Sequence, residues 1–173
     1  QERWAEANEK LRQSLALKTA ILGAAPHEEK AAVWDNIGDL HRDQQQYAAA
    51  LEAYQKAIIN RVPGFENEDF LQHPRLQQTQ IPGGWQPLLV VMISKTRTLR
   101  LLYAQQQDPK TLQAALAAAH LCDLIIDRLL REYTTRQAKL FLRQQSSQAY
   151  EEGLLICKLL HDRSQDQAIL DEV

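Results

Sequence analysis

The stretch AAVWDNIGDLHRDQQQYAAALEAYQKAIIN, residues Ala31–Asn60, predicts the fold of this chain. Apolar residues recur every three or four positions on both sides of a short polar segment, Arg42–Gln46. That spacing places apolar side chains along one face of an α-helix. The stretch therefore predicts two amphipathic helices joined by a tight turn.

The composition of these two helices also predicts that they pack closely. Gly38 and Ala50 would let the two backbones approach, and aromatic side chains would fill the space beside them. Large, small and aromatic residues in this order resemble the tetratricopeptide (TPR) helix–turn–helix. The alternative interpretation is an ordinary amphipathic helix pair. The residues that carry the resemblance are Trp34, Gly38, Tyr47, Ala50, Tyr54 and Ala57.

The spacing of the second helix recurs near the N-terminus, which favours a repeat protein. Trp4, Ala7, Leu11, Ser14 and Leu15 are spaced as Tyr47, Ala50, Tyr54, Ala57 and Ile58 are. We therefore predict an all-α, right-handed solenoid of about six main helices, open at both ends. Its expected parts are the second helix of a truncated repeat (2–22), a central TPR (28–61), an irregular insert (62–87), a second helical hairpin (88–132) and further helices (135–173).

Two parts of this prediction are more detailed. The insert is rich in Pro and Gly and contains scattered aromatic residues, so we expect it to be packed by its own side chains, with a short helix around residues 66–72. In the last part, Thr134 or Thr135 would cap a helix that runs to about His161, and a separate helix would begin at Asp166.

Composition narrows the classes of function. The chain has 173 residues, is 45% hydrophobic and 24% charged, and carries a net charge of −2, so no overall basic field predicts nucleic-acid binding. Its longest apolar run, Leu88–Ile93, is too short to span a bilayer. Cys122 and Cys157 lie among aliphatic residues in helical patterns, which favours free thiols and a cytoplasmic location. The chain begins with Gln1 rather than Met, so we expect it to be part of a longer protein.

A succession of short motifs resembles the TPR-like region that precedes the peptidase domain in bacterial CHAT proteins, which are caspase- and separase-like cysteine peptidases. The motifs are Val62-Pro63-Gly64-Phe65, Pro74-x-Leu76, Leu88-Leu89, Lys95-x-x-x-Leu99, Leu102-Tyr103, Asp108-Pro109-x-x-Leu112-x-x-Ala115-Leu116, Asp127-Arg128-Leu129-x-Arg131-Glu132-Tyr133, Ala138-Lys139-Leu140-Phe141-Leu142 and Ala149-Tyr150-Glu151. The Gly83-Gly84-Trp85 segment departs from this pattern. The resemblance implies a non-catalytic arm that docks a partner. The catalytic His and Cys of that family lie further along the chain, so none of its catalytic residues is carried over.

No catalytic, cofactor-binding or metal-binding pattern is recognisable in the sequence. The chain has no Gly-rich phosphate loop and no HExxH, and His120 and Cys122, two apart on a helix, would face different directions. We expect His41 to be packed in the fold, whereas His73, in the insert, would be exposed. The chain is therefore not expected to be an enzyme.

Protein binding is the function that the repeat pattern predicts best. TPR arrays hold an extended or helical segment against the first helices of their repeats. The expected groove residues are Asn36, Asp39, Arg42, Asp43 and Arg97, with Asp35, Lys95 and Arg100 beside them. Their mixed charges predict a partner segment of mixed charge, either as part of a CHAT-type protein or in a stand-alone TPR adaptor.

Two other interpretations stay open. One is RNA binding by a basic cluster, which is better explained as a solvated or intramolecularly paired face, so we expect no nucleic-acid partner. The cluster consists of Arg128, Arg131, Arg136, Lys139 and Arg143. Exposed end faces of a solenoid could also lead to self-association.

Overall fold

The computed structural model of the chain describes residues 2–76 and 80–171, and it is all-helical, with six α-helices and no strand in these ranges. The helices are α1 (Glu2–Leu22), α2 (Glu28–Asp43), α3 (Tyr47–Ile59), α4 (Trp85–Gln106), α5 (Pro109–Glu132) and α6 (Arg136–Asp171).

α2 and α3 form the helix–turn–helix predicted from the central stretch. The His27 side chain caps α2 by accepting a hydrogen bond from the backbone N–H of Glu29. The turn is completed by Gln45, whose φ of 60° reverses the chain between the two helices. At Gly38 an added Cβ would lie 2.6 Å from Cδ1 of Tyr54, so only glycine allows this helix contact. The predicted close approach of the two helices is present at this position.

The residues of the TPR-like signature all lie in or beside this contact. Gly38, Ala50, Tyr54 and Ala57 are buried, and Trp34 and Tyr47 are half-buried against the core. Trp34 is also covered by the Lys56 ammonium group, 4.6 Å from the ring centroid.

α4 and α5 form a second pair. Asp108 caps α5, because its carboxylate accepts the backbone N–H groups of Lys110 and Thr111, and Pro109 occupies the first helical position. α4 begins at Trp85, inside the segment predicted to be irregular, because Pro87 lies in the first helical turn, where it is tolerated.

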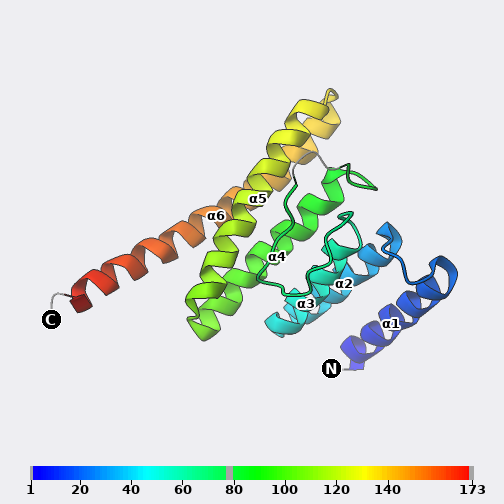
Figure 1. The fold of residues 1–173 in the computed structure, drawn as a ribbon, viewed down its shortest axis with the longest axis horizontal. Coiled ribbons are helices and arrows are strands. Elements are labelled where there is room, and N and C mark those ends of the chain that lie inside the picture. The colour runs from blue at the N-terminus through cyan, green and yellow to red at the C-terminus, as the bar shows by residue number, and fades with distance from the viewer. Residues whose placement is uncertain (1, 77–79, 172–173) are drawn as a thin grey trace.

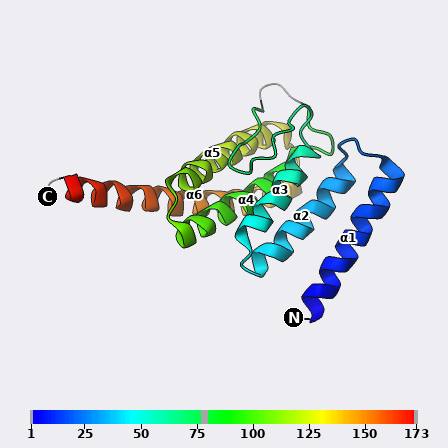
Figure 2. The same ribbon diagram turned by 60° about the horizontal axis from the view of Figure 1, so that its bottom comes forward.

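The last part of the chain differs from the prediction. α6 is one continuous helix from Arg136 to Asp171, whereas the sequence predicted a break before Asp166. No Pro or Gly interrupts residues 154–171, so nothing in the backbone chemistry ends the helix there. α6 is longer than α5, and its C-terminal part extends away from the other helices (Figures 1 and 2).

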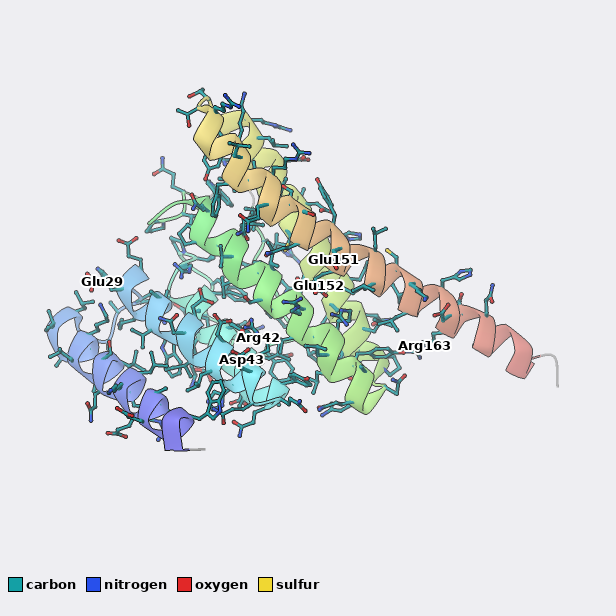
Figure 3. The ribbon with its side chains drawn as sticks, turned by 180° about the vertical axis from the view of Figure 1, so that it is seen from behind. Glu29, Arg42, Asp43, Glu151, Glu152 and Arg163 are labelled. Carbon is teal, nitrogen blue, oxygen red and sulfur yellow. The ribbon has the colours of Figure 1, made fainter. Side chains whose placement is uncertain are left out.

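The helices are arranged in two layers. α4 contacts both α2 and α6, and these three helices lie on the side seen in Figure 3. α3 and α5 lie behind them, and each packs on the helices that precede and follow it in the chain. α1 packs beside α2 at one end (Figure 2).

The main core lies between α3, α4, α5 and the first part of α6. Its largest fully buried apolar side chains include Leu51, Tyr54, Leu89, Met92 and Ile125. A smaller cluster of Val33, Ile37 and Ala53 receives Leu11 and Leu15 of α1.

The insert between α3 and α4 crosses the side of the molecule that carries α3 and α5 (Figure 1). Val62, Ile81 and Trp85 are buried in the main core, and Phe65 and Phe70 pack against it. The short helix expected at residues 66–72 is absent. Asn67 and Asp69 instead accept hydrogen bonds from the backbone two residues ahead, which favours turns over a helix.

Candidate functional site

The layer formed by α2, α4 and α6 carries two groups of charged residues. Figure 3 shows Arg42 and Asp43 on α2, and Glu151 and Glu152 on α6, on the side facing the viewer. The insert lies on the opposite side of the molecule (Figure 1) and leaves this layer uncovered. We refer to this side as the charged face.

The first group is on α2. Arg42 donates to Asp39 Oδ1 at 2.7 Å and to Asp43 Oδ1 at 3.1 Å. The Tyr54 hydroxyl on α3 donates to Asp39 Oδ1 at 2.7 Å, and burial, followed by the negative charge of Asp39, raises the pKa of Tyr54 above its ordinary value. Asn36 is exposed one turn earlier. Two carboxylates surround one guanidinium, so this group is acidic.

The second group joins α4 to α6. Arg97 Nε donates to Glu152 Oε1 at 3.0 Å, and Arg100 Nε donates to Glu152 Oε2 at 2.6 Å. The Glu152 side chain is only 6% exposed, whereas that of Arg97 is 56% exposed. Two guanidinium groups meet one carboxylate, so this group is basic.

The expected groove residues therefore fall into two groups rather than one continuous set. Asn36, Asp39, Arg42 and Asp43 are together on α2, and Arg97 is tied to α6.

Two neighbouring residues were wrongly assigned to the groove. Asp35 points toward Arg61, with their closest charged atoms 3.5 Å apart, and burial raises the pKa of Asp35 to about 6. Lys95 is completely buried.

Lys95 lies at the centre of a buried polar cluster that the sequence did not predict. Its Nζ donates to Gln55 Oε1 at 2.6 Å and to the Gln72 carbonyl at 2.9 Å, and it lies 3.1 Å from His73 Nδ1. His73 Nε2 is 2.8 Å from the carbonyl oxygen of Ala114. The cluster thus joins α3, α4, α5 and the insert.

Gln55 binds the insert with the other end of its amide group. Its Nε2 lies 2.6 Å from the Asn67 carbonyl oxygen, 2.9 Å from that of Asp69 and 3.4 Å from that of Gln72. His73 was expected to be exposed, and this prediction is wrong. The contacts of its two ring nitrogens with Lys95 and Ala114 hold it half-buried. The signal in the sequence was a Lys on the apolar face of α4, between Leu88 and Leu99, and a Gln on the apolar face of α3.

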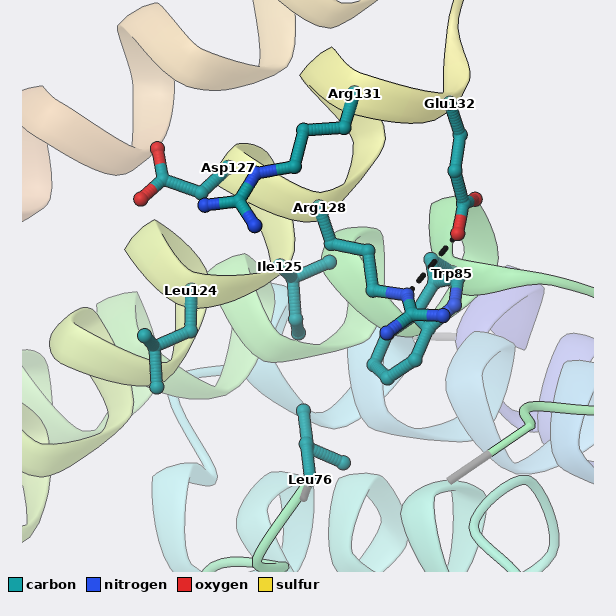
Figure 4. A pocket seen from close by; sticks show the side chains of 8 residues that line it. All are labelled: Leu76, Trp85, Leu124, Ile125, Asp127, Arg128, Arg131 and Glu132. Atoms are coloured by element: carbon teal, nitrogen blue, oxygen red, sulfur yellow. Dashed lines mark hydrogen bonds and ion pairs between the residues drawn. The ribbon is translucent and has the colours of Figure 1, made fainter. Parts of the chain in front are cut away.

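A cavity of about 650 Å³ lies on α5 beside the N-terminus of α4 (Figure 4). Leu76, Trp85 and Ile125 line it, together with charged residues of α5. Arg128 lies over the Trp85 ring, 4.8 Å from its centroid, and donates to Glu132 at 3.0 Å. Arg128 of the predicted basic cluster is therefore engaged in contacts within the chain.

Arg131 is exposed on α5 and lines the same cavity, whereas the other three members of that basic cluster are exposed in the first part of α6. Arg136, Lys139 and Arg143 line a shallow hollow of about 390 Å³ together with Thr134 and Leu140.

No protein-family model, no curated protein and no solved structure matches this chain. Within the described residues, three or more metal-ligating side chains gather nowhere, and none of the helices has the length and apolarity needed to cross a membrane.

Of the remaining reactive side chains, His120 of α5 and Cys157 of α6 line one shallow hollow of about 380 Å³. Cys122 is buried and Cys157 is exposed, and both are free thiols. Burial raises the pKa of Cys122 to about 12, which makes this thiol a poor nucleophile. His120 is exposed while Cys122 is buried, in keeping with the prediction that the two face different directions. His41 is half-buried and contacts Gln46 at the α2–α3 turn.

Proposed function

We propose that the chain is a non-catalytic protein-interaction module of the TPR-like, right-handed solenoid type, and that its charged face binds a partner segment of mixed charge. The observation that carries the proposal is the division into layers: α2, α4 and α6 form one side, and the insert covers the other. Repeat proteins of this type use the first helices of their hairpins as the binding surface.

The two groups of charges suggest how a segment would be oriented. The acidic group on α2 favours a Lys or Arg of the partner, and the basic group at the α4–α6 junction favours an Asp or Glu. Both groups are held in place by contacts within the chain, so little side-chain entropy is lost when a partner binds.

Site-specific photocrosslinking tests the location of the binding surface. A photoreactive residue would replace Asn36 on the charged face or Gln113, an exposed residue of α5, in cells that make the full-length protein. We expect the same partner band from position 36 and none from position 113. Equal labelling at both positions would contradict the proposal.

Neutralising one charge in each group tests whether the two groups recognise the partner segment. Asp43→Asn and Arg97→Gln should each weaken capture of that partner by about fivefold, the effect of losing roughly 1 kcal/mol from an exposed charge pair. Glu52→Gln and Arg75→Gln are matched controls, because both residues are exposed on α3 and the insert. If the control variants lose binding to the same extent, the charged face is not the binding site.

We further propose that this module is the regulatory or docking arm of a CHAT-type cysteine peptidase, on the motif resemblance described above. A stand-alone TPR adaptor is the alternative. A thiol-directed activity probe, applied in the source cells, separates the two. A labelled native polypeptide larger by a peptidase domain supports the CHAT arm, and an unlabelled one ending near Val173 supports the adaptor.

A further inference from the structure

The buried polar cluster fixes one part of the insert, residues Asn67–His73, which we call the strap. All contacts that the cluster makes with the strap are made through Gln55, Lys95 and the Ala114 carbonyl. Each of these partners comes from a different helix, α3, α4 and α5 respectively. The strap is therefore held by a small number of buried polar contacts, together with the packing of Phe70 and Leu71 against the core.

The hydrogen-bond partners define the state of His73. The Ala114 carbonyl oxygen can only accept, so Nε2 of His73 carries the hydrogen. Nδ1 is then the acceptor for Lys95 Nζ, 3.1 Å away. The imidazole is thus neutral in the closed strap, with both nitrogens in use.

Lys95 is in its ammonium form below about pH 7. Three acceptors surround its Nζ, namely Gln55 Oε1, the Gln72 carbonyl and His73 Nδ1, and they match the three N–H groups of an ammonium ion. A second proton on His73 would place an N–H on Nδ1 and direct it at this cation. The closed strap cannot hold both charges at that distance.

The other charged groups do not relieve this conflict. Asp69, within the strap, is the carboxylate whose charge acts on both Lys95 and protonated His73. Neither side chain forms an ion pair with it, and its Oδ1 accepts a hydrogen bond from the Leu71 backbone N–H. α3 contributes the amide of Gln55 and α5 contributes a backbone carbonyl, neither of which carries a charge.

We propose that the strap is an acid-released closure: protonation of His73 expels it from Lys95 and Ala114 and opens residues 67–73 away from α3, α4 and α5. Opening would uncover Gln55 and Lys95 and free Phe70 and Leu71 from the core, on the side of the molecule opposite the charged face. Burial, followed by the charge of Lys95, lowers the pKa of His73 to about 4, which is the direction this geometry requires.

The second buried ionic group next to the insert acts in the opposite direction. The pKa of Asp35, which faces Arg61, is raised rather than lowered. A group whose pKa is raised in the folded state favours that state as the pH falls. Asp35 therefore cannot be the cause of acid release.

Hydrogen exchange of the intact chain, followed by mass spectrometry and corrected for the intrinsic pH dependence of exchange, tests the proposal. If His73 has an ordinary pKa in the open state, the equilibrium constant for opening the strap rises on the order of a hundredfold between about pH 7 and about pH 4. α4 and α5 should change far less. Unchanged protection of the strap, or an equal loss over the whole chain, would overturn the proposal.

Two variants test the role of the imidazole. His73→Gln keeps one donor and one acceptor but does not titrate, so strap protection should become independent of pH. His120→Gln, on the exposed side of α5, should respond as the unaltered chain does. A full acid response in His73→Gln would show that another group is responsible.

A measurement on the unaltered chain is decisive even if His73→Gln does not fold. In an NMR titration of labelled histidines, His73 should be the Nε2–H tautomer and should protonate near pH 4. The other histidines provide the reference. Protonation of His73 near the ordinary value of about 6.5, or an Nδ1–H tautomer, would overturn the proposal.

Discussion

At Gly38 the backbone of α2 passes so close to the Tyr54 ring that a side chain has no room. Tyr54 cannot move aside easily, because its ring is fully buried and its hydroxyl is held by Asp39. We expect Gly38→Ala to destabilise the fold by about 2 kcal/mol through overpacking, despite the better helix propensity of Ala. Urea denaturation measures the difference.

Gly153 is the matched control for this prediction. It is also helical, but a Cβ there would meet nothing within 4 Å. Gly153→Ala should therefore leave stability unchanged or raise it by up to about 1 kcal/mol. Similar destabilisation by both substitutions would mean that the contact with Tyr54 is not the cause.

Because Lys95 is buried, the free energy of unfolding should increase as the pH rises above neutral. Burial lowers its pKa from about 10.5 to about 7, so the unfolded chain binds more protons than the folded chain between these values. Stability should then rise with pH, by up to about 2 kcal/mol between about pH 7 and about pH 8.5. This window lies below the ordinary pKa of the Cys122 thiol, 9.0, so that thiol contributes little.

Denaturation at a series of pH values measures this rise. Lys95→Met should abolish it, whereas Lys110→Met, at an exposed lysine of α5, should retain it. A flat profile in the unaltered chain would show that Lys95 is not buried as a titrating cation.

At the scale of single residues, the sequence predicts packing better than it predicts polar contacts. Gly38, Ala50 and Tyr54 could be identified because helical periodicity places them on one face. Lys95 and Gln55 could not be placed, because periodicity does not report which distant segment will supply hydrogen-bond partners. His73 was missed for the same reason: its partners are on α4 and α5.

At the scale of elements, α6 contacts α4 through a buried carboxylate as well as through apolar side chains. Glu152 receives both Arg97 and Arg100, and loss of its charge leaves two guanidinium groups with a neutral acceptor. We expect Glu152→Gln to lower the free energy of unfolding by about 2 kcal/mol, the range found for hydrogen bonds to charged groups. Glu151→Gln, at the exposed neighbouring position, should have almost no effect.

Hydrogen exchange can show whether this loss is local. In Glu152→Gln, faster exchange in α6 than in α4 would be expected, because α6 contributes fewer residues to the core than α4 does. An unchanged α6 would indicate that apolar contacts alone hold it in place.

Element boundaries were predictable where capping residues mark them. Asp108-Pro109 defined the start of α5, and α1 has the expected bounds of residues 2–22. The start of α4 was placed too late because Pro87 was interpreted as part of the irregular insert. The helix expected around residues 66–72 does not form, since its backbone carbonyls are bound by Gln55.

At the scale of the whole molecule, stability should be uneven along the chain. None of the described side chains of α1 is fully buried, and Trp4, Leu17 and Ile21 are exposed. α1 rests on the small cluster around Val33 and Ile37 and on a surface ion pair between Lys18 and Glu29. Such an element opens at lower free energy than the core.

We therefore expect the amides of α1 to exchange faster than those of α4 and α5 by at least about tenfold under native conditions. Exchange of the intact chain measured by NMR or mass spectrometry gives the comparison. Equal protection of α1 and α5 would show that the chain unfolds as one cooperative unit.

The buried position of Lys95 also constrains the order in which the chain can fold. Its acceptors come from α3 and from the insert, so α4 cannot dock on α3 at low cost while residues 67–73 are still unstructured. A docked helix pair without the insert would leave this cation at the surface of α3 with only one of its three partners, Gln55 Oε1, which is unfavourable. We therefore expect the irregular segment to close as the two hairpins join rather than in a later step, wherever His73 is neutral.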